Sequence, residues 1–144
     1  MSNSNYERDF YAWANEQAAL LRAGELGQAD IEHIAEEIAS MGRTEKRELV
    51  NRLAILLSHL LKWRHQPALR GNSWRLTIED QRDQLEDHLS DNPSLKASLS
   101  EAIKAGYRRA ILAAARETGI DRDAFGRECP WSFEQMMDAD YWPD

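Results

Sequence analysis

The chain has 144 residues, with 25 Asp or Glu against 18 Lys or Arg and a formal net charge of −7. This length can form one domain whose hydrophobic core needs no disulfide or metal. The negative charge excludes a basic protein that coats nucleic acid. Ala occurs 19 times and Leu 16 times, but Val occurs once and Thr three times. Because β-branched residues favour strands, this composition predicts an all-α protein.

The N-terminal segment predicts a helix over residues 6–23, preceded by a polar tail of residues 1–4. Ser4 and Glu7 have the spacing of a capping box, in which the two side chains bond to free backbone groups at the helix start. Phe10 and Trp13 then begin an apolar series at helical spacing, and Gly24 ends it.

A long helix is predicted next, from Asp30 to about Arg64. Asp30 is a suitable N-cap. The apolar stripe of this segment continues beyond Gly42 in nearly the same angular phase, which two independent helices would have no reason to keep. We therefore expect Gly42 to break the helix locally at most. The stripe consists of Ile31, Ile34, Ile38, Met41, Leu49, Leu53, Leu56, Leu60 and Trp63.

Three further helices follow. Pro67 stops the long helix, and the next helix starts at Asn72 or Ser73. Asn92-Pro93 has the pattern of an N-cap followed by proline and predicts a helix that runs to Gly119. Ser132 with Gln135 predicts a short helix through Met137. The expected fold is one domain, residues 1–144: an antiparallel bundle of four main helices plus a short C-terminal helix.

Small residues and aromatic residues add two expectations about packing. Gly106 lies on the apolar face of the helix that ends at Gly119, where a small residue lets a neighbouring helix approach. Four aromatic residues crowd the C-terminus, where they either dock on the bundle or form a partner surface, and burial favours docking. They are Trp131, Phe133, Tyr141 and Trp142.

Charge is unevenly distributed. Residues 49–78 contain five Lys or Arg and no Asp or Glu, whereas residues 117–144 carry a net charge of −6. The first segment indicates an anion site at the start of a helix, with Arg70, Ser73, Trp74 and Arg75 as candidates. The alternative interpretation gives these residues a purely structural role: the cations complement the dipole at a helix C-terminus, and the arginines pair with acids of the C-terminal segment.

Histidines and glutamates provide an alternative hypothesis, a metal-dependent or other enzyme. It would use His59, His88 and either Glu36 or Glu37. A di-metal bundle needs Glu-x-x-His from each of two helices, and this chain has only a related Asp-x-x-His, once. We therefore expect no metal and no cofactor. His59 lies at the edge of the apolar face, where a hydrogen-bonded residue is the simpler interpretation.

A nucleophilic enzyme has less support. Cys129 is the one cysteine, and the nearby acids Glu128 and Glu134 would raise the pKa of its thiol. No Gly-rich phosphate loop or nucleophile motif occurs. The N-terminus has no signal-peptide pattern and no apolar run approaches the length of a membrane span. We expect a cytoplasmic protein of unknown oligomeric state.

Several segments in order resemble the bacterial domain-of-unknown-function family twenty-nine, DUF29. The resemblance covers nearly the whole chain and implies an all-helical, single-domain bacterial protein. It implies no activity and no catalytic roles. The family pattern includes His59 to Trp63, so His59, Lys62 and Trp63 are candidates for a pocket or partner surface. The matching segments are 6–13, 21–24, 30–38, 59–63, Pro67, 73–82, 93–95, 107–110 and 129–130.

Together these features predict a helical bundle that acts by binding rather than by catalysis. Its partner would be a protein or a small anionic ligand. The enzyme using His59 and His88 is the alternative. A third hypothesis is that this chain is a regulatory partner, such as the inhibitory half of a two-protein system. Only the absence of catalytic motifs supports it.

Overall fold

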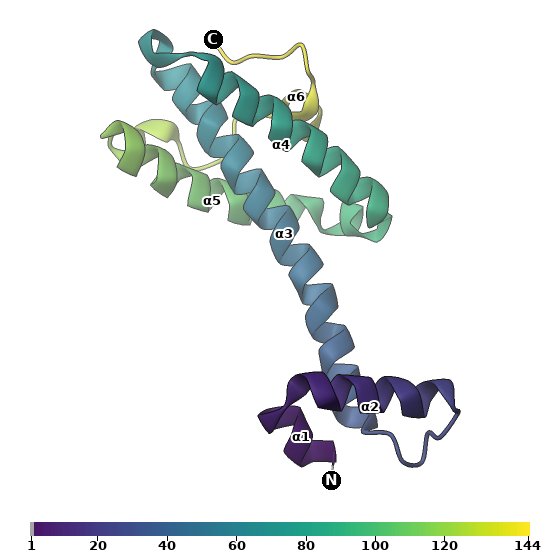
Figure 1. Cartoon of the computed structure of the whole chain (residues 1–144). Coiled ribbons are helices and arrows are strands. Elements are labelled where there is room, and N and C mark those ends of the chain that lie inside the picture. The colour runs from purple at the N-terminus through teal and green to yellow at the C-terminus, as the bar shows by residue number, and fades with distance from the viewer. Residues whose placement is uncertain (1) are drawn as a thin grey trace. The chain divides into compact units, whose positions relative to one another are not determined.

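The computed structural model describes the backbone of residues 2–144 and the side chains of residues 5–144. No strand occurs in this part of the chain, so the all-α prediction is confirmed (Figure 1). No helix within it is long and apolar enough to cross a membrane. The helices are α1 (Ser2–Arg8), α2 (Phe10–Arg22), α3 (Ile31–His65), α4 (Asn72–Asp91), α5 (Leu99–Thr118) and α6 (Phe133–Met137).

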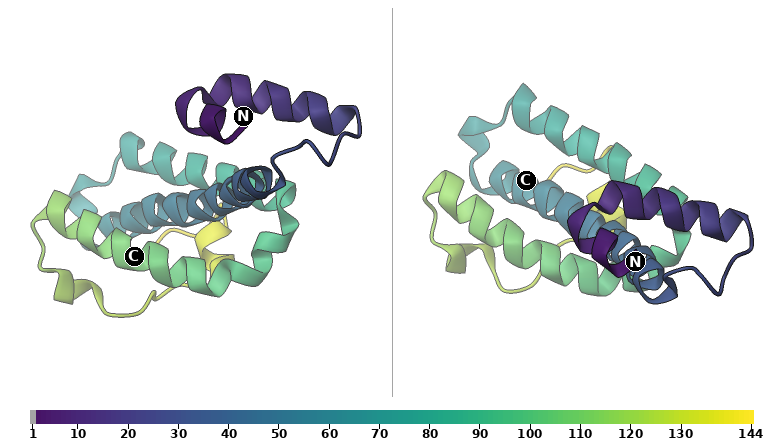
Figure 2. Two further views of the ribbon diagram at one scale, coloured as in Figure 1. Left: turned by 90° about the horizontal axis from the view of Figure 1, so that it is seen from below. Right: turned by 60° about the horizontal axis from the view of Figure 1, so that its bottom comes forward.

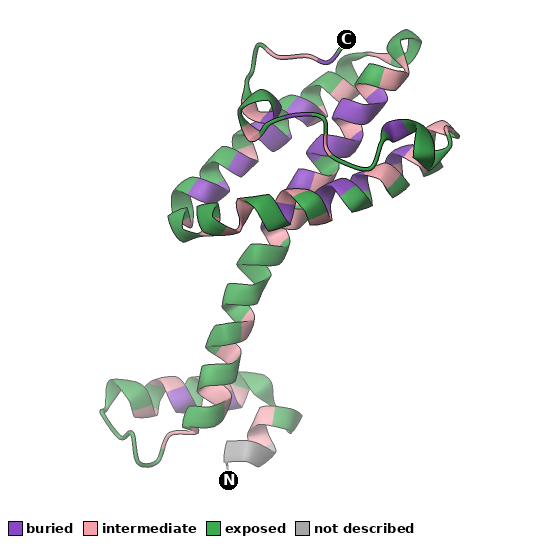
Figure 3. Cartoon of the chain, turned by 180° about the vertical axis from the view of Figure 1, so that it is seen from behind, coloured by how far each residue is buried: buried purple, intermediate pink, exposed green. Residues whose placement is uncertain are grey.

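The chain divides into two compact units, an N-terminal unit of residues 1–44 and a C-terminal unit of residues 45–144. Helix α3 contributes to both. The prediction of one long helix with at most a local break at Gly42 is confirmed, and no break occurs, because α3 is a single α-helix of 35 residues. Figure 3 shows where the two units differ: buried positions gather in the C-terminal unit, and the stretch of α3 before Glu48 is mostly exposed.

The N-terminal unit consists of α1, α2 and the first part of α3. The helix expected from residue 6 is interrupted at Asp9, whose side chain accepts a hydrogen bond from the Ala12 amide at 3.1 Å and so caps α2. The predicted Ser4 cap lies outside the described side chains. Asp30 joins α2 to α3, because it accepts from Trp13 Nε1 at 3.1 Å and its amide donates to Gln17 at 2.7 Å.

The C-terminal unit contains the hydrophobic core. Residues 45–65 of α3 lie between α4 and α5, and consecutive helices run antiparallel (Figure 2). Gly106 of α5 permits a close approach to α3, since a Cβ atom there would lie 3.1 Å from Leu53 Cβ. The fully buried side chains include Leu49, Leu53, Leu56, Leu57, Leu60, Leu61, Ile78 and Leu85.

Turns and caps largely follow the sequence. Pro67 opens a 3-10 turn, η1 (Pro67–Leu69), and Pro93 opens η2 (Pro93–Ser98), so α5 starts at Leu99, later than predicted. Gly119 ends α5 with φ of 78°, a left-handed conformation that favours glycine. A third 3-10 segment, η3 (Arg122–Phe125), follows. The capping box of Ser132 and Gln135 forms with both of its hydrogen bonds.

Candidate functional site

Arg70, which was predicted to bind an anion, already forms hydrogen bonds within the chain. Its Nε donates to the carbonyl of Trp63 at 2.6 Å, and its Nη2 donates to the carbonyl of Pro143 at 3.3 Å. The guanidinium also lies over the Trp63 ring, 5.4 Å from the centroid. Main-chain carbonyls, and not the acids expected in the alternative interpretation, therefore occupy Arg70.

The other three anion candidates lie on the first turn of α4 with separate partners. Arg75 donates to the side chain of Asn72. Ser73 is exposed, and its carbonyl accepts from Thr77 at 3.0 Å. Lys62 Nζ lies 5.3 Å from the centre of the Trp74 ring. Because these residues have different partners, the contacts give no shared binding geometry, and the anion site at the four candidate residues stays a prediction.

The partner candidates His59, Lys62 and Trp63 lie in the second half of α3. Lys62 is 4% exposed and pairs with Glu117 at 3.3 Å. Burial holds the pKa of His59 below its usual value, and its Nδ1 lies 2.8 Å from the Ile55 carbonyl oxygen. The Trp63 ring packs against Trp142, with the two centroids 4.7 Å apart. Much of the surface of these three residues is thus buried or in contact with other residues of the chain.

Arg82 is a buried residue that the sequence analysis missed. It is 4% exposed, and it donates from Nε to the Met136 carbonyl at 2.6 Å and from Nη2 to the Tyr141 carbonyl at 2.8 Å. Burial lowers the pKa of this guanidinium. Its position between Ile78 and Leu85 on the apolar stripe of α4 was the available signal. Arg82 and Arg70 together hold the C-terminal segment on the bundle, and Trp142 packs on both Trp63 and Arg82.

The residues of the enzyme hypothesis have separate partners. His88 Nε2 lies 2.9 Å from the Glu45 carbonyl oxygen. Glu36 pairs with Arg43 at 2.8 Å, and Glu37 accepts from the Tyr6 hydroxyl at 2.5 Å, which raises the pKa of Tyr6 to about 12. Within the described chain, no three His, Cys, Asp or Glu side chains are grouped so that they could hold a metal. These residues therefore show no metal-binding geometry.

Cys129 is half-buried and unsuited to act as a nucleophile. Burial raises the pKa of its thiol, against a weaker opposing contribution from the hydrogen bond to the Trp131 carbonyl at 3.5 Å. The predicted direction agrees, but the main cause is burial and not the neighbouring acids. A raised pKa reduces the thiolate fraction on which nucleophilic chemistry depends.

An open apolar groove of about 540 Å³ lies on the N-terminal unit, between α2 and the first part of α3. Helix α2 supplies Phe10, Trp13 and Leu21, and α3 supplies Ile38 and Met41. Both helical stripes are visible in the sequence as apolar periodicity, which does not show whether they are buried. In the structure Ile38 is 64% and Met41 68% exposed, so this groove (hereafter the α2–α3 groove) is open to solvent.

Comparison with known proteins identifies a family and nothing further. The family model described as Domain of unknown function DUF29 matches residues 5–142. Searches of the curated proteins and of the solved structures found no significant match. The resemblance seen in the sequence is thus confirmed over nearly the full length of the chain.

Proposed function

Because the chain belongs to the family Domain of unknown function DUF29, whose description states no activity, we propose a function from its surface: a non-catalytic binding protein whose α2–α3 groove receives a basic amphipathic helix of a partner protein. The exposed apolar lining of this groove carries the proposal. Large contiguous apolar surfaces are uncommon on soluble proteins and mark interaction sites.

The groove is apolar along both of its helices. Phe10 is 48% and Leu21 41% exposed on α2, and Ile38 and Met41 are more exposed still on α3. Small side chains, Ala14 and Ala18, lie between Phe10 and Leu21 on the same face. A partner's large apolar side chains fit above such small residues, and a flexible Met adapts its shape to them.

The spacing of the lining residues favours a helical partner. Those on α2 recur every three or four positions from Phe10 to Leu21, a distance of about 16 Å along the helix axis. Helices pack by placing such ridges into the grooves of another helix. A partner helix of about three turns, with apolar residues at i, i+3, i+4 and i+7, matches this length.

Charge selects among helical partners. The N-terminal unit has eight acidic residues against three arginines, a net charge of −5, and Glu37 itself lines the groove. The C-terminal unit, with more than twice the residues, carries only −2. A basic helix gains attraction to the acidic surface, whereas a second copy of this unit brings the same negative charge and is repelled.

A synthetic peptide tests the proposal on the full chain. The probe is a fluorescent amphipathic helix of Leu and Lys, and the control peptide keeps the Leu positions but replaces every Lys by Glu. We expect the Lys peptide to bind in fluorescence anisotropy, more tightly at low salt, and the Glu peptide to bind at least about tenfold more weakly.

Two variants locate the binding surface. Ile38→Gln combined with Met41→Gln removes exposed apolar contacts, and we expect it to weaken binding of the Lys peptide by about tenfold or more. Leu76→Gln is the control, because Leu76 of α4 is 58% exposed and is not one of the residues that line the groove. Circular dichroism verifies that both variants keep their helix content.

Three results would overturn the proposal. The first is equal binding of the Lys and Glu peptides, and the second is equal loss in the Leu76→Gln control. The third is a concentration-dependent dimer in sedimentation that becomes monomeric with Ile38→Gln and Met41→Gln, because the occupant would then be a second copy.

A further inference from the structure

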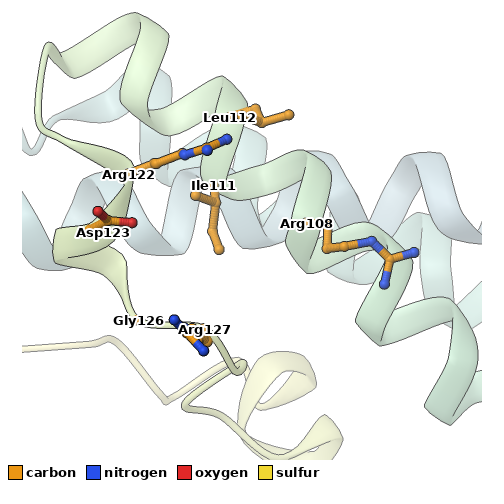
Figure 4. Close-up of a pocket in the computed structure, with 7 residues that line it drawn as sticks. All are labelled: Arg108, Ile111, Leu112, Arg122, Asp123, Gly126 and Arg127. Atoms are coloured by element: carbon orange, nitrogen blue, oxygen red, sulfur yellow. The ribbon is translucent and has the colours of Figure 1, made fainter.

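We propose that an open cavity between α5 and η3 binds a small organic phosphate. This arginine cavity has a volume of about 520 Å³, within the range of about 300–1,000 Å³ typical of ligand sites. Its polar lining comes from Arg108, Arg122, Arg127 and Asp123 (Figure 4). Every residue of this site belongs to the C-terminal unit, so the proposal is independent of the α2–α3 groove.

Positive charge is concentrated in this lining. The lining holds three guanidinium groups and one carboxylate, a formal balance of +2 in a chain whose net charge is −7. Guanidinium groups bind phosphate through paired N–H donors, and several together favour a multiply charged anion.

The three arginines of the lining have guanidinium donors to spare. Among residues 5–144, no hydrogen bond or ion pair uses the guanidinium of Arg108, Arg122 or Arg127. By contrast, Arg43 and Arg52 pair with carboxylates. An incoming ligand therefore has no internal partner to displace at these three residues.

A fixed scaffold presents these side chains. Tyr107 of α5 is 2% exposed, and its hydroxyl bonds to the carbonyls of Phe125 at 2.7 Å and Gly126 at 3.2 Å. Gly126 has φ of 86°, a conformation that other residues rarely adopt, and it turns the chain just before Arg127. The buried Phe125 side chain further holds η3 against the core. Because the loop is anchored, less ordering is needed when a ligand binds.

Apolar side chains indicate that the ligand is organic and not a bare ion. Ile111 and Leu112 of α5 also line the arginine cavity. Figure 4 shows Arg122 extending toward Leu112, and Ile111 pointing to the side where Arg127 lies. A phosphate can bind the guanidiniums while a ring or chain of the same molecule covers these two residues. A nucleoside diphosphate has this combination of groups.

Calorimetry with pyrophosphate and with ADP, both without metal, tests the site in the full chain. We expect saturable binding of both and tighter binding of ADP. Arg122→Gln combined with Arg127→Gln should weaken each by at least about tenfold. Leu112→Gln should weaken ADP and leave pyrophosphate unchanged, because it removes only apolar surface.

The control is Arg116→Gln, an exposed arginine of α5 outside the arginine cavity, which should leave both affinities unchanged. Equal weakening by Arg116→Gln would mean attraction by overall charge and would overturn the site. An absence of saturation up to about 1 mM, the weak end of specific binding, would do the same. Equal affinity for ADP and pyrophosphate that Leu112→Gln does not change would overturn the organic ligand.

Discussion

One apolar stripe runs along both halves of α3, yet its residues are mostly buried in one unit and mostly exposed in the other. In the C-terminal unit, Leu49, Leu53 and Leu56 are fully buried. In the N-terminal unit, Ile38 and Met41 are mostly exposed, and no residue of α3 before Leu49 is buried. Periodicity shows which side chains share a face, and whether that face is core or surface depends on what packs against it.

The units are also stabilised differently. The C-terminal unit relies on aliphatic burial. The N-terminal unit relies on stacked rings and polar contacts, with the Tyr6 and His33 rings 4.0 Å apart and His33 Nδ1 2.8 Å from Asp30 Oδ2. Burial acts to raise the pKa of Asp30, but hydrogen bonds from His33 and Trp13 outweigh it and lower that pKa.

The largest contrast between the units is expected from truncating the stripe of α3. Leu56→Ala should reduce the free energy of unfolding by about 2–5 kcal/mol, because it leaves a cavity in the core. Ile38→Ala, on the exposed part of α3, should change it by no more than about 0.5 kcal/mol. Urea unfolding followed by circular dichroism measures both. Similar losses would show that Ile38 is covered in solution.

Removal of a buried charge should have the next largest effect. Arg82→Met leaves the carbonyls of Met136 and Tyr141 without their donor, and we expect a loss of about 1.5–3 kcal/mol. Faster proteolysis of the C-terminal segment should accompany this loss. Arg75→Met, an exposed position on the same helix, is the control and should stay within about 0.5 kcal/mol. An unchanged proteolysis rate would contradict the anchoring role of Arg82.

Two mid-helix glycines should respond in opposite directions. Gly106→Ala places a Cβ atom 3.1 Å from Leu53 Cβ and 3.3 Å from the Ala54 amide nitrogen, so overpacking of about 1–3 kcal/mol should exceed the gain in helix propensity. Gly42→Ala meets nothing within 4 Å and should stabilise α3 by about 0.5–1 kcal/mol. Thermal unfolding distinguishes the two. Stabilisation by both would mean that α3 and α5 have room to move apart.

The smallest effect concerns pH. Because burial lowers the pKa of folded His59 below 6.5, the unfolded chain takes up a proton first as the pH falls. The contribution of His59 is therefore fully present above about pH 6.5 and decreases below it. Urea midpoints measured between about pH 5 and 8 should show this decrease, and His59→Gln should make it shallower. An unchanged slope in His59→Gln would contradict the assignment to His59.

Local rules predicted much of the fold. Composition gave the class, the phase of the stripe across Gly42 predicted one helix, and Ser132 with Gln135 predicted the last cap. The break at Asp9 was missed, because the apolar series of α2 conceals the start of a second helix. The start of α5 was placed too early, because Pro93 suits a 3-10 turn as well as an α-helix.

The sites were less predictable, for a physical reason. Arg70 and Arg82 bind main-chain carbonyls, which every residue has and no sequence pattern reveals. The arginine cavity depends on the chain after Gly119 folding back onto α5, a tertiary contact made through Tyr107. The α2–α3 groove depends on an absence of covering residues, which periodicity cannot report.

The attachment of the C-terminal segment through its main chain has an evolutionary consequence. Because Arg70 and Arg82 bind carbonyl oxygens of Met136, Tyr141 and Pro143, a side-chain replacement in this segment does not remove the atoms that hold it. An exposed acid such as Asp140 can thus be replaced without removing these acceptors. The two arginines have no such freedom, so selection for a docked segment acts on them and on the packed side chains of Met136 and Trp142 more than on the exposed acids of the tail.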